Sequence, residues 1–352
     1  MIKGDYMSDI NIVNGSIVGV HLGAPMQDAT PSKPEDNEVY ATERNTVTRI
    51  GNAVDTWDEQ PVPSGGASGG GSTEEWFEDG DTHIWIDLTE GRTSPIVGLF
   101  VNGTVTVDWG DGSTPDTLTG KSTANTLVIT PVHEYAKVGN YVITISGDGK
   151  IGFYGANRNA TSLFSSINYN SNNNENNAYR AAVTRIECGS NVSNINSNAF
   201  TGLYRLREVR LPNNINYLGS SAFAYCYALR NVTIPDSVTT IADSCFKECY
   251  SLNEINIPNG VTKLEATFTQ CKGLGKIVIP PSVTAVNSGV FQYCYSLAIC
   301  DFSQHTTVPN LNDSMVFQGT PSDCQILVPA ALVNDWKAAT NWSNYADKIV
   351  GV

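Results

Sequence analysis

Two stretches of the chain repeat one pattern, AFAYCYALRNVTIPDSVTTI (222–241) and CFKECYSLNEINIPNGVTKL (245–264). Each has a Phe near its start, a Cys three residues later, a Leu six residues later, and then an apolar-x-apolar-Pro step. The Phe recurs at spacings of 23, 23, 22, 23 and 26 residues, in the order Phe200, Phe223, Phe246, Phe268, Phe291 and Phe317. A fixed period of roughly 20–29 residues with this apolar core predicts a solenoid of stacked coils.

Between the inward Ile, Val and Leu positions stand residues that must point away from the core. One predicted column holds Arg210, Thr233, Asn256 and Val278, and its neighbour holds Glu208, Asn231, Glu254 and Lys276. These side chains differ from coil to coil, as a recognition surface requires. A face that is merely solvated would look similar, so both interpretations stay open.

A column of tyrosines is a second candidate. Four residues after successive Phe positions lie Tyr204, Tyr227, Tyr250, Lys272 and Tyr295. Aromatic rings in a row can stack on sugars or anchor a protein partner, and they can equally serve to cover the core. The candidate ligand-binding residues are Arg210, Thr233, Asn256, Glu208, Asn231, Glu254, Tyr227, Tyr250 and Tyr295.

The cysteines and histidines give no sign of catalysis. Cys226, Cys249, Cys271 and Cys294 share one inward column, which predicts small, reduced core residues because free Cys is among the most buried residue types. No CxxC pair and no Cys/His cluster with metal-ligand spacing occurs, and the four His are scattered. We therefore expect no metal, no cofactor and no enzymatic activity; a glycan hydrolase would need paired carboxylates that we cannot place.

The rest of the chain divides by composition. Period-two runs such as THIWIDL, TVTVDWG and YVITISG predict a small antiparallel β-sandwich. The predicted fold class is mainly β with short helices, a small β-sandwich followed by a solenoid of repeats. The predicted segments are an N-terminal attachment segment or disordered tail (1–60), a Gly/Ser-rich linker (61–75), the sandwich (76–151), an Asn/Ser-rich transition (152–182), the repeats (183–330) and a capping helix (331–352).

The charge of the chain is uneven. The net charge is −14, and residues 1–75 hold four Lys/Arg against twelve Asp/Glu, whereas residues 151–352 hold thirteen of each. The acidic half should repel nucleic acid and anionic membranes, so we expect neither as a partner. The chain has no apolar run of about 18 residues, which predicts no membrane insertion. Its start lacks the features of a signal peptide, whether Met1 or Met7 is the first residue.

Two motifs in the predicted sandwich resemble a known family. VDWGDGST (107–114) and HEYAKVGNYVITISG (133–147) look like the PKD-like immunoglobulin-type fold. The resemblance implies that Trp109 is a core residue and that the GDG sequence forms a tight turn. Asp108 and Asp111 would then bond nearby backbone amides. A calcium site at these two carboxylates is the alternative.

The repeats resemble the BspA-like class of leucine-rich repeats across about residues 183–330. The ending ILVPAALVNDWKAATNWSNYADKIV (326–350) is similar to the terminal strand and capping helix of such arrays. This resemblance implies an extracellular adhesion or recognition role without catalysis. The first unit departs from it at Leu203, where Cys is expected, and the sixth lacks the Ile-Pro step, so the number of repeats stays open.

These features together predict a bacteriophage virion fibre or decoration protein. Residues 1–60 would dock on virion structural proteins, and residues 183–330 would bind a host-surface glycan or protein. The expected location is the virion surface, with homo-oligomerisation left open. The alternatives are a bacterial cell-surface adhesin, which would be extracellular, and a structural spacer that stabilises the particle.

Overall fold

The structure is a computed structural model. It describes residues 8–13, 16–21, 39–41, 48–50, 76–77, 79–89, 95, 97–120, 127–129, 133–153, 155–157, 160–161 and 181–352. These residues belong to two compact units, Met1–Gly70 and Gly71–Val352. Among them the structure has many short strands and one short α-helix, so the predicted mainly-β class is confirmed.

The first unit contains a small antiparallel sheet in the order β2-β1-β3-β4. Its strands are β1 (Ser8–Val13), β2 (Ser16–His21), β3 (Val39–Ala41) and β4 (Thr48–Ile50). The attachment role of residues 1–60 stays a prediction. The linker at 61–75 lies outside the described residues, as does most of the predicted transition at 152–182.

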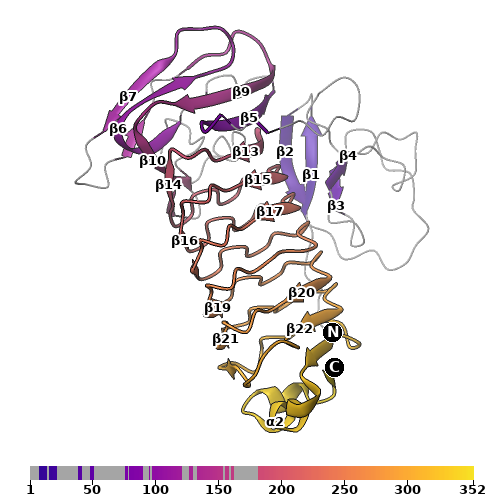
Figure 1. Cartoon of the computed structure of the whole chain (residues 1–352). Helices are drawn as coiled ribbons and strands as arrows, with labels where there is room; N and C mark the ends of the chain where they lie inside the picture. Colours follow the sequence, from indigo (N-terminus) through magenta and orange to yellow (C-terminus); the bar gives the residue numbers. More distant parts are fainter. Residues whose placement is uncertain are drawn as a thin grey trace. The chain divides into compact units, whose positions relative to one another are not determined.

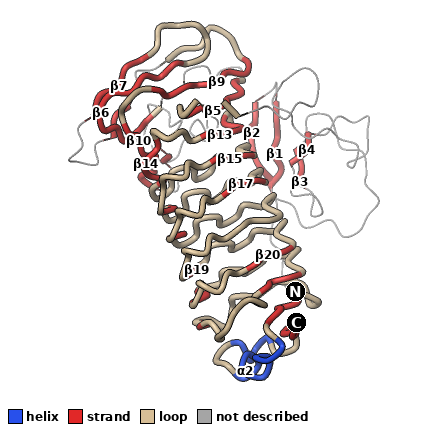
Figure 2. The backbone as a smooth tube through the Cα atoms, in the orientation of Figure 1, coloured by secondary structure: helices blue, strands red, loops and turns tan. Residues whose placement is uncertain are grey.

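The second unit contains the predicted solenoid, whose coils stack along residues 181–352 (Figure 1). Its strands form two faces of parallel strands, drawn in red in Figure 2. The first face consists of β13 (Val183–Glu187), β15 (Glu208–Arg210), β17 (Asn231–Thr233), β20 (Lys276–Val278), β22 (Ile299–Asp301), β24 (Gln325–Val328) and β25 (Ile349–Gly351). The second face consists of β14 (Val192–Ile195), β16 (Tyr217–Leu218), β18 (Thr240–Ile241), β19 (Lys263–Glu265), β21 (Ala285–Asn287) and β23 (Asn310–Leu311).

The repeated Phe and Cys form two continuous columns inside the coils. Neighbouring Phe rings lie 4.9–6.0 Å apart from Phe153 through to Phe317, and each is buried. The Cys249 thiol donates to the carbonyl of Phe223 in the preceding coil at 3.2 Å, and the other Cys of the column do the same. All eight cysteines are free and buried, which confirms the prediction of reduced core residues.

The turns between the faces depend on left-handed residues that the sequence did not reveal. The position two residues after each Phe has a positive φ throughout the array. Its occupants are Gly202, Tyr225, Glu248, Gln270, Tyr293 and Gly319, with φ between 60° and 77°. Because this conformation disfavours residues with a Cβ, the four non-glycine coils carry a local conformational cost.

Residues 82–153 extend both faces of the solenoid. Their strands are β5 (Thr82–Leu88), β6 (Gly98–Asp108), β7 (Asp116–Gly120), β8 (Leu127–Ile129), β9 (Gly139–Ser146) and β10 (Lys150–Phe153), followed by β11 (Gly155–Asn157) and β12 (Ala160–Thr161). β5 pairs antiparallel with β13 of the first face, and β10 pairs parallel with β14 of the second face. The two strand groups meet at β6, which changes its partners near Gly103, where φ is 95°.

The two motifs quoted from this region contact each other. Trp109 is fully buried, and the Tyr135 hydroxyl donates to its backbone carbonyl at 2.8 Å. The His133 ring stacks on Trp109 with centroids 4.5 Å apart and lies 2.9 Å from a carboxylate oxygen of Asp111. Burial would raise the pKa of Asp111, but hydrogen bonds from Ser113 and His133 outweigh it and lower this pKa. The Asp111 carboxylate therefore accepts a hydrogen bond from the backbone N–H of Ser113 within the turn, as the turn interpretation expected.

The C-terminal end differs from the predicted capping helix over 331–352. The α-helix, α2, covers only Val333–Ala338 and lies between two short 3-10 turns, η2 (Ala330–Leu332) and η3 (Trp342–Tyr345). The chain then returns as β25, which pairs parallel with β24. A strand forms there because Ile349 can enter the core while the final residues complete the first face.

Both faces are interrupted at the same level. One sheet ends at β17 and β18, and separate sheets begin at β19 and at β20. Only Asn256 makes an isolated parallel bridge, to Val278, in the coil between. The turns that connect the two faces remain hydrogen-bonded from coil to coil at this level, since Phe246 donates its N–H to the carbonyl of Thr267 at 3.0 Å.

Candidate recognition surface

The first face of the solenoid presents the two predicted columns in register. Glu208 pairs with Asn231, Arg210 with Thr233, and Asn256 with Val278. The side chains of Thr233, Asn256, Asn231 and Glu254 are exposed, whereas those of Glu208 and Arg210 are half-buried. The structure therefore brings the predicted columns together, and the binding role of their residues stays a prediction.

Two members of these columns already have ionic partners. Arg210 lies 3.3 Å from the carboxylate of Glu187, which is buried, and Glu208 lies 3.6 Å from Arg185. The Arg185 guanidinium lies between two indole rings, 3.7 Å from the centroid of Trp76 and 4.6 Å from that of Trp85. Arg210 is therefore a structural residue as well as a candidate contact, because its removal would leave a buried carboxylate without its cation.

The tyrosine column is more buried than a ligand platform should be. Tyr227 stacks between Tyr204 and Tyr250, with centroids at 5.3 and 4.7 Å, and Lys272 lies 4.2 Å above the Tyr250 ring. Burial is the largest cause that raises the pKa values of Tyr227 and Tyr250. Because Tyr227 and Tyr250 are half-buried and these rings cover one another's faces, the structure favours the interpretation that this column covers the core. Tyr295, which is 56% exposed, is the candidate of this set that solvent reaches most freely.

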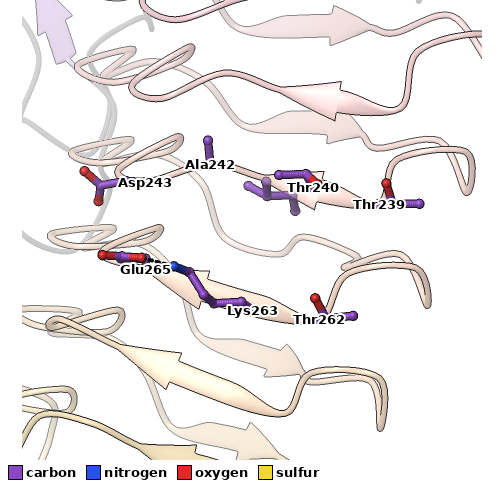
Figure 3. Close-up of a pocket in the computed structure, with 8 residues that line it drawn as sticks. Thr239, Thr240, Ala242, Asp243, Thr262, Lys263 and Glu265 are labelled. Carbon is purple, nitrogen blue, oxygen red and sulfur yellow. Dashed lines mark ion pairs between the residues drawn. The ribbon is translucent and has the colours of Figure 1, made fainter.

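The second face carries a hollow that the sequence did not indicate. It has a volume of about 240 Å³ and lies where β18 and β19 are unpaired. Its lining residues are Thr239, Thr240, Ile241, Ala242, Asp243, Thr262, Lys263 and Glu265. Figure 3 shows Lys263 and Glu265 pointing toward each other, and the two form an ion pair. The threonine hydroxyls give this hollow a neutral, hydrogen-bonding wall.

A pair of arginines at the edge of the first face was also missed. Arg207 and Arg230 each follow the repeated Leu, and Arg230 donates its backbone N–H to the carbonyl of Arg207 at 2.9 Å. The signal was present in the sequence, since the two occupy the same position of consecutive repeats. The two predicted columns do not include this pair, because those columns lie within the strands whereas Arg207 and Arg230 precede β15 and β17.

The part of the chain that the structure describes holds no group of three or more His, Cys, Asp or Glu placed to bind a metal ion. Within the same residues, no helix is long and apolar enough to cross a membrane. Burial raises the pKa of the Cys294 thiol to about 12, so this thiol stays protonated at neutral pH.

Comparison with known proteins agrees with the repeat pattern. Residues 165–298 match the family described as BspA type Leucine rich repeat region, in six copies. The chain therefore carries a BspA-type leucine-rich repeat region, as the sequence predicted. A search of curated proteins gave no match.

Three solved structures are similar to the chain. A leucine-rich repeat protein of T. pallidum is 22% identical, with a TM-score of 0.30, and the match covers 47% of this chain and 77% of that one. A leucine-rich repeat protein of Bacteroides ovatus is 23% identical, with a TM-score of 0.33 and coverage of 42% and 46%. A leucine rich cell surface protein of Faecalibacterium prausnitzii is 21% identical, with a TM-score of 0.34 and coverage of 50% and 40%. The chain thus spans less than half of the last two proteins.

Proposed function

We propose that the chain is a non-enzymatic surface-recognition protein whose solenoid binds a glycan or a protein on another surface. The observation that carries this proposal is the contrast between the two sides of each first-face strand. The inward side repeats small apolar residues, as at Val209, Val232 and Ile277, all buried. The outward side changes at every coil, from Arg210 to Thr233 to Asn256. Stability requires only the inward repetition, so the outward variation is available for recognition.

The setting of this role has two versions. In the first, the chain is a phage virion fibre or decoration protein, docked through residues 1–60 and binding the host surface through its repeats. What supports it is the division into a small acidic first unit and a larger repeat-bearing unit. In the second, the chain is a bacterial cell-surface adhesin, which the BspA-type repeat region favours. A spacer that stabilises the particle without binding a host is the remaining alternative.

We also propose that residues 76–151 are a PKD-like β-sandwich. The contacts between its two motifs support this, because the Trp109 ring, the His133 ring and the Tyr135 hydroxyl form one cluster. Its part in the function is to present the solenoid. The pairing of β5 with β13 and of β10 with β14 joins the two regions through backbone hydrogen bonds.

Adhesion of the full chain to intact bacteria tests the recognition role. Labelled protein should bind cells, and the double variant Thr233→Ala/Asn256→Ala should bind more weakly at unchanged stability, because both side chains are exposed. The matched control is Thr340→Ala/Asn344→Ala, which removes the same two side chains from exposed positions near the C-terminus. If the ligand is a glycan, periodate treatment of the cells should abolish binding. If the ligand is a protein, protease treatment of the cells should abolish it. No adhesion to any host surface would leave only the spacer role.

The location of the chain separates the two settings. Gold-labelled antibody against the protein should decorate phage particles in the first setting and intact bacterial cells in the second. Labelling of cells in a culture that contains no phage would reject the virion version and keep the recognition role.

A further inference from the structure

The arginines at the N-terminal end of the first face differ in how their charges are balanced. Arg205 pairs with Asp87 at 2.8 Å, Arg210 with Glu187, and Arg185 with Glu208. Arg207 and Arg230 form no ion pair or side-chain hydrogen bond with any residue that the structure describes. Arg207 and Arg230 therefore have no carboxylate in direct contact among the described residues, although Glu208 and Asp87 lie close enough to act on the charge of Arg207.

The fold places the backbones of the two arginines one coil apart, since Arg230 donates its backbone N–H to the carbonyl of Arg207 at 2.9 Å. β15 and β17 pair in register, with Glu208 opposite Asn231, so the preceding residues Arg207 and Arg230 occupy equivalent places on adjacent coils. Adjacent parallel strands lie about 4.8 Å apart. The charge of each arginine therefore acts on that of the other, and an anion bound to both would offset this repulsion. Burial, followed by the charges of Arg205 and Arg230, lowers the pKa of Arg207, while the carboxylates of Glu208 and Asp87 act in the opposite direction.

We propose that Arg207 and Arg230, here called the arginine corner, bind the carboxylate or sulfate group of an acidic polysaccharide. This inference rests on the surface-recognition role proposed above and names the class of ligand for it. A guanidinium group binds an oxyanion through two parallel N–H bonds, and two such groups one coil apart can hold a single oxyanion from both sides.

The surroundings of the arginine corner favour a glycan over other polyanions. Asn231 and Asn253 lie beside it with exposed amide groups, which suit the hydroxyls of a sugar. The large apolar side chains exposed on or beside this face are Val278 and Phe77, which donates its backbone N–H to Glu187, and an exposed aromatic ring such as that of Phe77 can also stack on a sugar. Nucleic acids and anionic membranes are dense in charge, and a net charge of −14 opposes their approach more strongly than that of a glycan with one acidic group per sugar or disaccharide.

Three dextrans that share one backbone provide the test. The full chain is measured at about 0.15 M salt against neutral dextran, carboxymethyl dextran and a lightly sulfated dextran, the last two with about one acidic group per sugar or disaccharide. We expect binding to one or both acidic dextrans and none to the neutral polymer; the two acidic arms distinguish a carboxylate ligand from a sulfate ligand. A DNA duplex serves as the competing polyanion. Equal binding to all three dextrans, or tighter binding to DNA, overturns the proposal.

The variant R207Q/R230Q should weaken binding to the acidic dextran at least about tenfold, since each charge-assisted hydrogen bond contributes measurably to affinity. The matched control K263Q/K337Q also removes two positive charges, from exposed side chains on the second face and on α2, and should change binding less than about twofold. Equal loss in both double variants would show that only net charge matters and would reject the site. If R207Q/R230Q does not fold, modification of the wild type with phenylglyoxal replaces it: the acidic dextran should protect Arg207 and Arg230, and no protection rejects the site.

The cell-adhesion assay separates this inference from the proposed function. Adhesion without binding to either acidic dextran keeps the recognition role and rejects the arginine corner. Binding to an acidic dextran that R207Q/R230Q abolishes, without adhesion to any cell, upholds the corner and rejects the recognition role.

Discussion

The two ends of the solenoid are closed by different means. At the N-terminal end, β5 and β10 continue the two faces, so the first coil is covered by backbone hydrogen bonds. At the C-terminal end only the first face gains another strand, β25, while the second face ends at β23. There the side chains of Asn341 and Trp342 donate to the carbonyls of Leu311 and Pro309, at 2.6 and 2.8 Å.

This difference shows which kind of change each end should tolerate. A ladder of backbone hydrogen bonds depends little on any single side chain, but it requires two strands to approach closely. At the C-terminal end a cluster of buried aromatic side chains, here called the plug, closes the core, so a few large residues carry most of the stabilisation. Trp336 and Trp342 lie 4.6 Å apart between ring centroids and are fully buried, next to Phe302. We therefore expect truncations to act most strongly at the C-terminal end, and added Cβ atoms at the N-terminal end.

The largest expected effect is that of Trp342→Ala. Removing this buried indole leaves a cavity and an unpaired Pro309 carbonyl, which should destabilise the protein by about 3–5 kcal/mol. Urea unfolding measures the loss, and hydrogen exchange should show that residues 300–352 open first. The control Lys337→Ala, exposed on α2, should change stability by less than about 0.5 kcal/mol. A loss below about 1 kcal/mol for Trp342→Ala would contradict the plug.

At the N-terminal end, Gly189→Ala should cost about 2–3 kcal/mol. A Cβ at this position would lie 2.2 Å from the backbone oxygens of Gly80 and Asp81, so the ladder between the two regions would have to separate. The control is Gly275→Ala, where the nearest atom is 3.9 Å away. If thermal melts show the two variants equally stable, the close backbone approach is not what closes this end.

Between the ends, Tyr227→Ala should destabilise by about 2 kcal/mol, because its ring is half-buried and stacks on Tyr204 and Tyr250. Tyr295→Ala is the matched control, and its 56% exposure predicts a loss of less than about 0.5 kcal/mol. Chemical denaturation of both variants measures the difference. Equal effects would mean that the stacked rings do not cover the core, which would favour the alternative of a ligand platform.

The sequence predicted the solenoid well because its period repeats apolar residues in every coil, and Phe223, Leu229 and Val232 are buried as expected. It predicted the outward columns for the same reason. It could not predict that β5 pairs with β13, since that ladder joins residues about 100 positions apart through backbone atoms that every residue possesses. The sequence left the role of Tyr227 open, because spacing identifies a column but not the side chains that cover it.

The smallest expected effect concerns the left-handed turn position, which also distinguishes the ends from the middle. The first and last coils have glycine there, Gly202 and Gly319, whereas Gln270 holds φ at 61° in the middle. Gln270→Gly should remove a conformational cost of about 1–2 kcal/mol. The greater freedom of glycine in the unfolded chain offsets about 0.5–1 kcal/mol of this, so a net gain in stability of up to about 1.5 kcal/mol is expected. The reverse change, Gly202→Ala, should lower stability by a similar amount. Both are measured by urea unfolding, and a loss of stability in Gln270→Gly would show that the Gln270 side chain contributes more to its coil than the backbone conformation costs.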